Sequence, residues 1–224
     1  MNSPELVIFD MDGLIFNTEQ LFMNKKAEVL KEYGYEARDE DYLKTLGTAG
    51  QQLLDILHEI YGPDYPAEEI SSKTRQIVNA EIETNGPEIK PGIKELLQWL
   101  QRENIPCCIA SSTHHIYVEK YLRQTGLLKY FSHIIGGNEV QRSKPEPDIF
   151  LAACGYFHIA PARALVLEDS ENGILAAWNA GIPVICIPDL KIPAPDIAQK
   201  AAAIVNTADK VIGLLENRDK KAGI

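Results

Sequence analysis

The chain has 224 residues, of which 45% are apolar, and it carries a formal net charge of −10. This length suits one domain with an insertion and a buried core. The negative charge disfavours nucleic acid and anionic membranes as partners, and no apolar run is long enough to cross a bilayer. The four cysteines lack paired metal-ligand spacing and predict reduced thiols. We therefore expect a cytoplasmic protein, a monomer or weak dimer, with a small-molecule ligand.

Short apolar runs bounded by turn residues recur along the chain and predict the strands of a parallel sheet. Such runs, apolar on both faces, are typical of strands covered by helices on each side. They are Leu6–Phe9, Cys107–Ala110, His133–Gly136, Ala164–Leu167, Pro183–Ile187 and Ala202–Val205. Amphipathic helical patterns lie between most of them. This alternation predicts an α/β fold with a doubly wound, parallel, Rossmann-like sheet.

The segment after the first run breaks this alternation. From about Thr18 to Asn85 the sequence shows helical periods separated by glycine-containing turns, and no strand pattern. We therefore expect an all-helical cap domain over residues 17–86. The core domain would comprise residues 1–16 and 87–224.

Polar side chains follow the predicted strands at the edge where open α/β sheets bind ligands. The candidates are Asp10 and Asp12 after the first run, Ser111 and Ser112 after the second, Lys144 before a helix, and Glu168 and Asp169 after the fourth. If the sheet closes as predicted, four acidic groups, a hydroxyl and an ammonium group converge there.

Clustered carboxylates cannot all ionise in a small volume without a counter-charge. A divalent cation supplies that charge, and ligation by oxygen alone favours Mg²⁺ or a close relative. Asp10 and Asp12 are two residues apart on an extended segment, so their side chains project to the same side. Such a pair suits a nucleophile and a general acid/base. Lys144 and Ser111 would bind phosphoryl oxygens.

The chain resembles the haloacid dehalogenase superfamily, in the branch of the β-phosphoglucomutase-like and phosphoglycolate-phosphatase-like enzymes. Four motifs carry the resemblance: LVIFDMDGLIFNTE, IASST, GGNEVQRSKPEPDIF and LVLEDSENGILAAWNAG. They span nearly the whole chain, with the helical segment between the first and second. The resemblance implies a Mg²⁺-dependent phosphatase that hydrolyses a small phosphorylated metabolite, such as a sugar phosphate, through an aspartyl-phosphate.

The same resemblance implies a role for each candidate residue. Asp10 would be the nucleophile, and Asp12 would protonate the leaving alcohol and then activate water. The transferring phosphoryl group would be held by Ser111, Ser112 and Lys144. The Mg²⁺ ligands would be Asp10, Asp12 through its backbone carbonyl, Asp169 and, directly or through a bound water, Glu168.

Residues of the cap distinguish a phosphatase from a mutase in this branch. The mutases carry a histidine and an arginine at positions that correspond here to Phe22 and Gly50. Arginine is the natural clamp for the second phosphate of a sugar bisphosphate, so its absence favours hydrolysis. A phosphosugar mutase and a non-catalytic sugar-phosphate sensor remain as alternatives. Candidate substrate contacts in the cap are Thr18, Glu19, Phe22 and Gly47.

Overall fold

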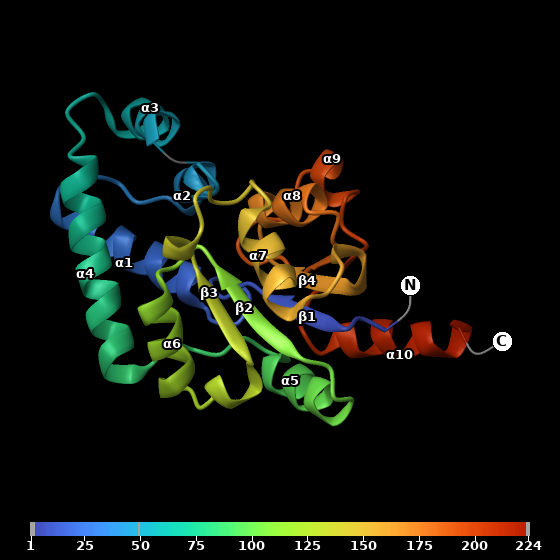
Figure 1. Ribbon diagram of the computed structural model, residues 1–224. Coiled ribbons are helices and arrows are strands. Elements are labelled where there is room, and N and C mark those ends of the chain that lie inside the picture. The colour runs from blue at the N-terminus through green and yellow to red at the C-terminus, as the bar shows by residue number, and fades with distance from the viewer. Residues whose placement is uncertain (1–2, 49, 223–224) are drawn as a thin grey trace. The chain divides into compact units, whose positions relative to one another are not determined.

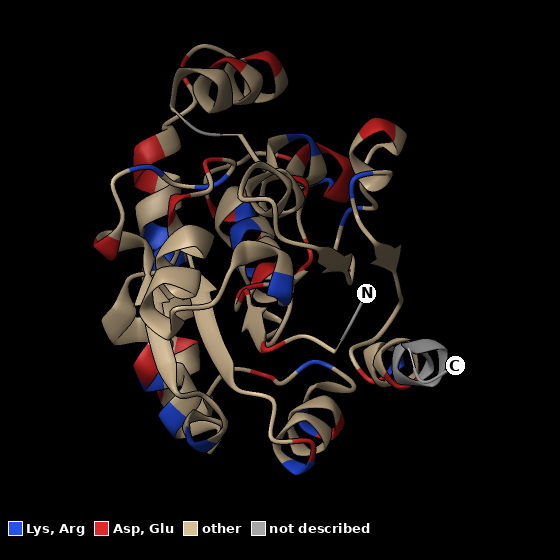
Figure 2. Cartoon of the chain, turned by 45° about the vertical axis from the view of Figure 1, so that its right-hand side comes forward, with Lys and Arg blue, Asp and Glu red and all other residues tan. Residues whose placement is uncertain are grey.

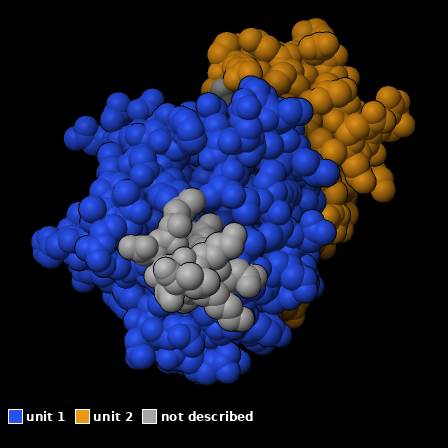
Figure 3. All heavy atoms as spheres, turned by 90° about the vertical axis from the view of Figure 1, so that its right-hand side faces the viewer, with its two compact units in different colours: residues 1–17, 87–224 blue, residues 18–86 orange. Residues whose placement is uncertain are grey.

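The computed structural model describes residues 3–48 and 50–222, and the chain divides into two compact units (Figures 1 and 3). One unit comprises Met1–Asn17 and Pro87–Ile224, coloured blue in Figure 3, and the other, in orange, comprises Thr18–Gly86. The second unit is therefore an insertion into the first. The predicted fold class, a parallel α/β sheet with an inserted helical segment, is confirmed.

The larger unit contains a six-stranded parallel sheet. Its strands are β1 (Leu6–Phe9), β2 (Cys107–Ser111), β3 (His133–Gly136), β4 (Ala164–Glu168), β5 (Val184–Cys186) and β6 (Ala203–Ile204). They lie in the order β3-β2-β1-β4-β5-β6, and every neighbouring pair is parallel. The central strands β1, β2 and β4 are buried along their whole length, as expected for a sheet covered on both faces.

Helices cover the sheet, and they connect the strands by crossovers. They are α5 (Ile93–Arg102), α6 (His115–Gln124), α7 (Asp148–Phe157), α8 (Glu171–Asn179), α9 (Pro195–Ala198) and α10 (Lys210–Ala222), with short 3₁₀ turns at Leu128–Tyr130, Gly137–Glu139 and Pro161–Arg163. Alternate strand residues such as Leu6, Ile8 and Val166 form one apolar cluster with residues of α7 and α8. Helices α5 and α10 contact each other and lie on the other side of the sheet (Figure 1).

Charged side chains are concentrated on the helices and loops, whereas the strands are nearly free of them (Figure 2). Glu168, at the carboxyl end of β4, is the charged residue within the described strands, and it is only 1% exposed. A buried charge at a strand end requires partners, which marks this edge of the sheet as a functional candidate.

The two connections to the helical insertion pair with each other. Asn17 donates its backbone N–H to the carbonyl of Glu88 at 2.9 Å, and its side-chain amide to the Glu88 carboxylate at 2.8 Å. The backbone N–H of Lys90 donates to the Ile15 carbonyl at 2.9 Å. These bonds tie both connections to the segment that directly follows β1.

The insertion consists of four helices in the described residues: α1 (Thr18–Glu32), α2 (Asp39–Thr45), α3 (Gly50–Tyr61) and α4 (Ala67–Asn85). A small core joins Val29 and Leu30 of α1 to Leu57 of α3 and Ile70 of α4. Tyr65 lies against this core, and its ring stacks on another tyrosine at 4.7 Å. Of the helices described in either unit, none has the length and apolar character needed to cross a membrane.

Candidate active site

The site lies at the switch point of the sheet, where the chain order reverses. From β1, the order runs to β2 and β3 on one side and to β4, β5 and β6 on the other. Ligands of open α/β folds bind outside the carboxyl ends of the strands at such a point. Phe9 of β1 is paired with Leu167 of β4, and the backbone N–H of Asp10 donates to the Leu167 carbonyl at 3.0 Å. This register sets Asp10 beside Glu168.

Lys144 joins the two buried carboxylates across this switch point. Its Nζ donates to Asp10 Oδ1 at 2.5 Å and to Glu168 Oε1 at 2.6 Å. All three side chains are at least nine-tenths buried, with 6%, 9% and 1% exposure for Lys144, Asp10 and Glu168. Burial alone would lower the pKa of Lys144, but the two carboxylates raise it above its ordinary value. The lysine is therefore a fixed positive charge.

Glu168 has all its acceptor positions engaged by the protein. Its Oε2 accepts hydrogen bonds from the backbone N–H groups of Asp169 and Ser170 and from the Ser170 hydroxyl, each at 2.9 Å. Burial would raise the pKa of Glu168, but Lys144 and the Ser170 donors together hold it below its ordinary value. The ionised Glu168 thus orients Lys144 and the start of α8.

The carboxylate of Asp12 is held by hydroxyl groups that follow β2. Thr113 donates its Oγ1–H to Asp12 Oδ2 at 2.6 Å, and Ser111 donates to the same oxygen at 3.4 Å. The Ser111 hydroxyl also accepts the backbone N–H of Thr113 at 3.1 Å. Asp12 is only half-buried, so this acid can reach both the site and solvent.

Three carboxylates form a cluster that is suited to a metal ion. Asp10, Glu168 and Asp169 each offer an oxygen within 4.8 Å of the others. Burial raises the pKa of Asp10 to about 7 against the attraction of Lys144, and the charges of Glu168 and Asp12 add to the increase. The pKa of Asp169 is also raised, by burial first and then by Glu168 and Asp10. The cluster thus contains three carboxylates, and Lys144 pairs with two of them.

A divalent cation fits this donor set. Gly13 leaves open the space beside Asp169, because a Cβ on it would lie 2.3 Å from Asp169 Oδ2. Gly13 also has a φ of +76°, which glycine adopts without strain. The donors are oxygens, as Mg²⁺ prefers. Asp10, Glu168 and Asp169 are the side chains that could hold the ion, and of these Glu168 already accepts four hydrogen bonds from the protein.

The structure brings together most, but not all, of the predicted site residues of the larger unit. Asp10, Asp12, Ser111, Lys144, Glu168 and Asp169 are linked by the contacts above. Ser112 is exposed, and its backbone lies against Gly137. Among the described contacts, none joins the Ser112 side chain to the cluster.

Two contributors were missed at the sequence level. Thr113 binds Asp12 more closely than Ser111 does, and its position two residues after Ser111 was the available signal. Asp189 approaches Gly13 from the end of β5. It follows the fifth apolar run just as Asp10 follows the first, so the strand-end rule could have found it.

Two of the four predicted substrate residues of the insertion, Glu19 and Phe22, contact Tyr42. The Tyr42 hydroxyl donates to Glu19 Oε2 at 3.2 Å, and its ring centroid lies 6.4 Å from that of Phe22. Thr18 is buried at the start of α1. Gly47 is exposed after α2, with a φ of +77°. Their role in substrate binding stays a prediction.

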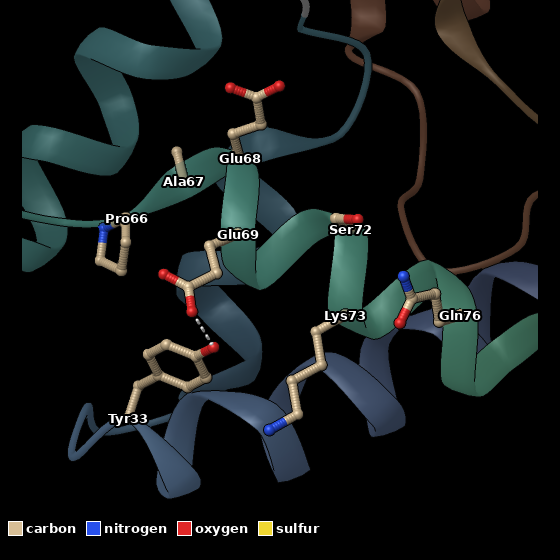
Figure 4. Close-up of a pocket in the computed structure, with 8 residues that line it drawn as sticks. All are labelled: Tyr33, Pro66, Ala67, Glu68, Glu69, Ser72, Lys73 and Gln76. Carbon is tan, nitrogen blue, oxygen red and sulfur yellow. Dashed lines mark hydrogen bonds between the residues drawn. The ribbon is translucent and has the colours of Figure 1, made fainter.

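The insertion also carries an open groove of about 780 Å³ along α4 (Figure 4). Two of its charged side chains, Glu69 and Lys73, are already paired. Tyr33 donates its hydroxyl to Glu69 at 2.6 Å, and Lys73 pairs with Glu32 of α1. The Tyr33–Glu69 bond is drawn as a dashed line in Figure 4. The groove therefore lacks the convergent, buried charges of the sheet edge, which is the stronger candidate for chemistry.

Comparison with known families identifies the family of the chain. Residues 7–187 match the model of the haloacid dehalogenase-like hydrolases. The chain belongs to this family. The matched range contains the whole of the site from Asp10 to Asp169, so the resemblance predicted from the four motifs is confirmed.

Individual relatives extend the comparison over most of the chain. A probable pseudouridine-5'-phosphatase of Drosophila melanogaster is 33% identical over 208 residues, covering 90% of this chain and 89% of that protein. The (DL)-glycerol-3-phosphatase 2 of Arabidopsis thaliana is 33% identical over 204 residues, covering 87% and 84%. The crystal structure of CbbY from Rhodobacter sphaeroides in complex with phosphate is 26% identical, with a TM-score of 0.74, covering 93% and 96%.

Proposed function

We propose that this hydrolase is a Mg²⁺-dependent phosphatase that cleaves small phosphomonoesters, such as sugar phosphates or similar metabolites, through an aspartyl-phosphate. The observation that carries the proposal is the convergence of Asp10, Asp12 and Lys144 at the switch point of the sheet. The names of the curated relatives and the phosphate bound in the CbbY structure support the same substrate class.

In the first half-reaction, a carboxylate oxygen of Asp10 attacks phosphorus and the bond to the leaving alcohol breaks. Lys144 holds Asp10 Oδ1, which fixes the direction of attack and offers positive charge to the phosphoryl oxygens. Asp12 gives its proton to the leaving oxygen, and its hydrogen bond from Thr113 orients it for this transfer. A Mg²⁺ ion held by Asp10 and Asp169 would supply charge stabilisation to the phosphoryl group.

In the second half-reaction, Asp12 returns as the base. The proton transfer has left it ionised, so it can take a proton from a water molecule that attacks the phosphorus of the aspartyl-phosphate. The bond between Asp10 and phosphorus breaks, inorganic phosphate leaves, and Asp12 is protonated again. The half-buried position of Asp12 allows this exchange with water, whereas the buried Asp10 is protected from it.

Hydrolysis is preferred to a mutase reaction because Phe22 and Gly50 stand at the two positions where the mutases carry a histidine and an arginine. Phe22 packs against Tyr42 rather than offering a hydrogen-bonding group, and Gly50 begins α3 without a side chain. A mutase must bind the non-reacting phosphate of its bisphosphate, for which arginine is the natural partner.

The proposal is tested by the hydrolysis of p-nitrophenyl phosphate with and without Mg²⁺. We expect Mg²⁺-dependent release of nitrophenolate by the parent protein and its loss in Asp10→Asn. Asp12→Asn should give a burst of about one equivalent of nitrophenolate and then slow turnover, because this leaving group needs little protonation while the second step needs a base.

Asp196→Asn is the matched control, because it removes one carboxylate from an exposed position of the same unit. It should keep the parent's rate. Turnover by Asp10→Asn at the parent's rate would overturn the nucleophile, and turnover in the presence of a chelator would overturn the metal dependence. Conversion of β-glucose 1-phosphate to the 6-phosphate with its bisphosphate activator, without release of phosphate, would show a mutase instead.

A further inference from the structure

Asp189 presents a buried carboxylate oxygen for which the described chain provides no hydrogen-bond donor. The residue follows β5 after Pro188, and its side chain is only 9% exposed. Its Oδ1 forms an ion pair with Lys90, while Oδ2 is buried and accepts no hydrogen bond from the part of the chain that the structure describes. A buried, ionised oxygen without a hydrogen-bond donor destabilises the folded protein. The burial of Oδ2 therefore needs an explanation.

The orphan oxygen lies near the Asp169 carboxylate, beside Gly13. A Cβ placed on Gly13 would lie 3.2 Å from Asp189 Oδ2 and 2.3 Å from Asp169 Oδ2. Both oxygens therefore border the small space that Gly13 leaves by having no side chain. The charge of Asp189 is also among the causes that raise the pKa of Asp169. Asp189 thus belongs electrostatically to the same cluster.

Lys90 fixes Asp189 in this orientation. The backbone N–H of Lys90 donates to the Ile15 carbonyl, two residues after Gly13, and its side chain is 16% exposed. The lysine, in the connection that precedes α5, therefore holds Oδ1 and leaves Oδ2 without a donor. The Lys90–Asp189 pair is neutral as a unit, so it can offer an acceptor to the cluster without adding net charge.

We propose that Asp189 is a positioning residue of the metal site, whose Oδ2 accepts a hydrogen bond from a water molecule bound to the Mg²⁺ ion held by Asp10 and Asp169. This inference rests on the proposed Mg²⁺-dependent function. Mg²⁺ in proteins keeps several of its waters, and acceptors in contact with such first-shell ligands contribute to metal affinity. The same contact would supply the donor that Asp189 lacks.

The test is the affinity of the metal-free protein for Mg²⁺ alone, measured by isothermal titration calorimetry without substrate. Asp189→Asn is the informative change, because it replaces one of the two carboxylate oxygens by an NH2 group, which donates and cannot accept a hydrogen bond from a metal-bound water while the remaining oxygen faces Lys90. We expect the Kd for Mg²⁺ to rise by about 10- to 100-fold, the range typical of such outer contacts. Asp196→Asn, which removes an exposed carboxylate, should leave the Kd unchanged.

A second variant tests the same role in case Asp189→Asn does not fold. Lys90→Met with Asp189→Leu removes the whole ion pair, and buried pairs replaced by apolar groups are commonly tolerated. It should fold, as measured by its thermal midpoint in a chelator, and show the same loss of Mg²⁺ affinity. Parent-like Mg²⁺ affinity in either folded variant would overturn the role of Asp189 while leaving the proposed function intact. A parent protein that binds no Mg²⁺ would overturn both.

Discussion

Gly173 makes the strongest single prediction, because any side chain there collides with Glu168. An ideal Cβ on Gly173 would lie 1.8 Å from Glu168 Cδ, 1.9 Å from Oε1 and 2.3 Å from Oε2. Carbon atoms do not approach so closely, so in Gly173→Ala either the carboxylate or the first turn of α8 must move. The carboxylate has no free direction, since Lys144 and the Ser170 donors hold both of its oxygens.

The magnitude follows from two opposing effects. Alanine in place of glycine favours a helix by about 1 kcal/mol. Against this, separating a buried ion pair such as Lys144–Glu168 costs roughly 3–5 kcal/mol. The free energy of unfolding should therefore fall by roughly 2–4 kcal/mol, which lowers the thermal midpoint of a chain of this size by on the order of 10 °C.

Urea unfolding, followed by circular dichroism, measures this change. Gly155→Ala is the matched control, because Gly155 also lies within a helix, α7, and a Cβ there meets nothing within 4 Å. That variant should be as stable as the parent or slightly more so. The reasoning is refuted if Gly173→Ala unfolds at the same urea concentration as Gly155→Ala, since helix propensity alone would then explain both.

Two further predictions concern the chemistry of the site. Thr113→Val removes the 2.6 Å hydrogen bond to Asp12. The loss of a bond to a charged group should reduce kcat for an alkyl phosphate by about 10-fold and leave KM unchanged in steady-state kinetics. An unchanged kcat would contradict the role given to Thr113. Burial raises the pKa of Asp10 from 3.8 to about 7, so the metal-free protein should lose stability as the pH rises through that window. Because Mg²⁺ competes with these protons, it should raise the thermal midpoint more near pH 8 than near pH 5, and equal shifts at both would count against metal binding at Asp10.

The sheet was predictable because each strand is apolar on both faces and short. The run His133–Gly136 was predicted with the bounds that the structure shows. The fifth run was predicted from Pro183 to Ile187, but the strand is Val184–Cys186, because proline cannot donate a ladder hydrogen bond. Helices α9 and α10 were not predicted. α10 contains Gly213, which weakens its helical pattern.

The sequence predicted the site residues that lie at the carboxyl ends of strands. Asp10 and Glu168 follow strands that are neighbours in the sheet, so topology alone brings them together. Ser112 was included because it adjoins Ser111, yet it is exposed. The positions of Thr113 and Asp189 near strand ends made them candidates, but their contacts with Asp12 and beside Gly13 depend on the conformation of the turns after β2 and β5, which local spacing does not encode.

The four acidic side chains of the motifs differ in how far other groups of the protein already bind their carboxylate oxygens. Glu168 is saturated by Lys144 and backbone donors, and Asp12 is held by hydroxyl groups, whereas Asp10 and Asp169 keep raised pKa values. A phosphomonoester adds roughly 1.5–2 negative charges to this site, and Lys144 is already shared between two carboxylates. Under the proposed function, Lys144 alone supplies too little positive charge for the substrate, so we expect binding of the substrate and binding of Mg²⁺ to favour each other.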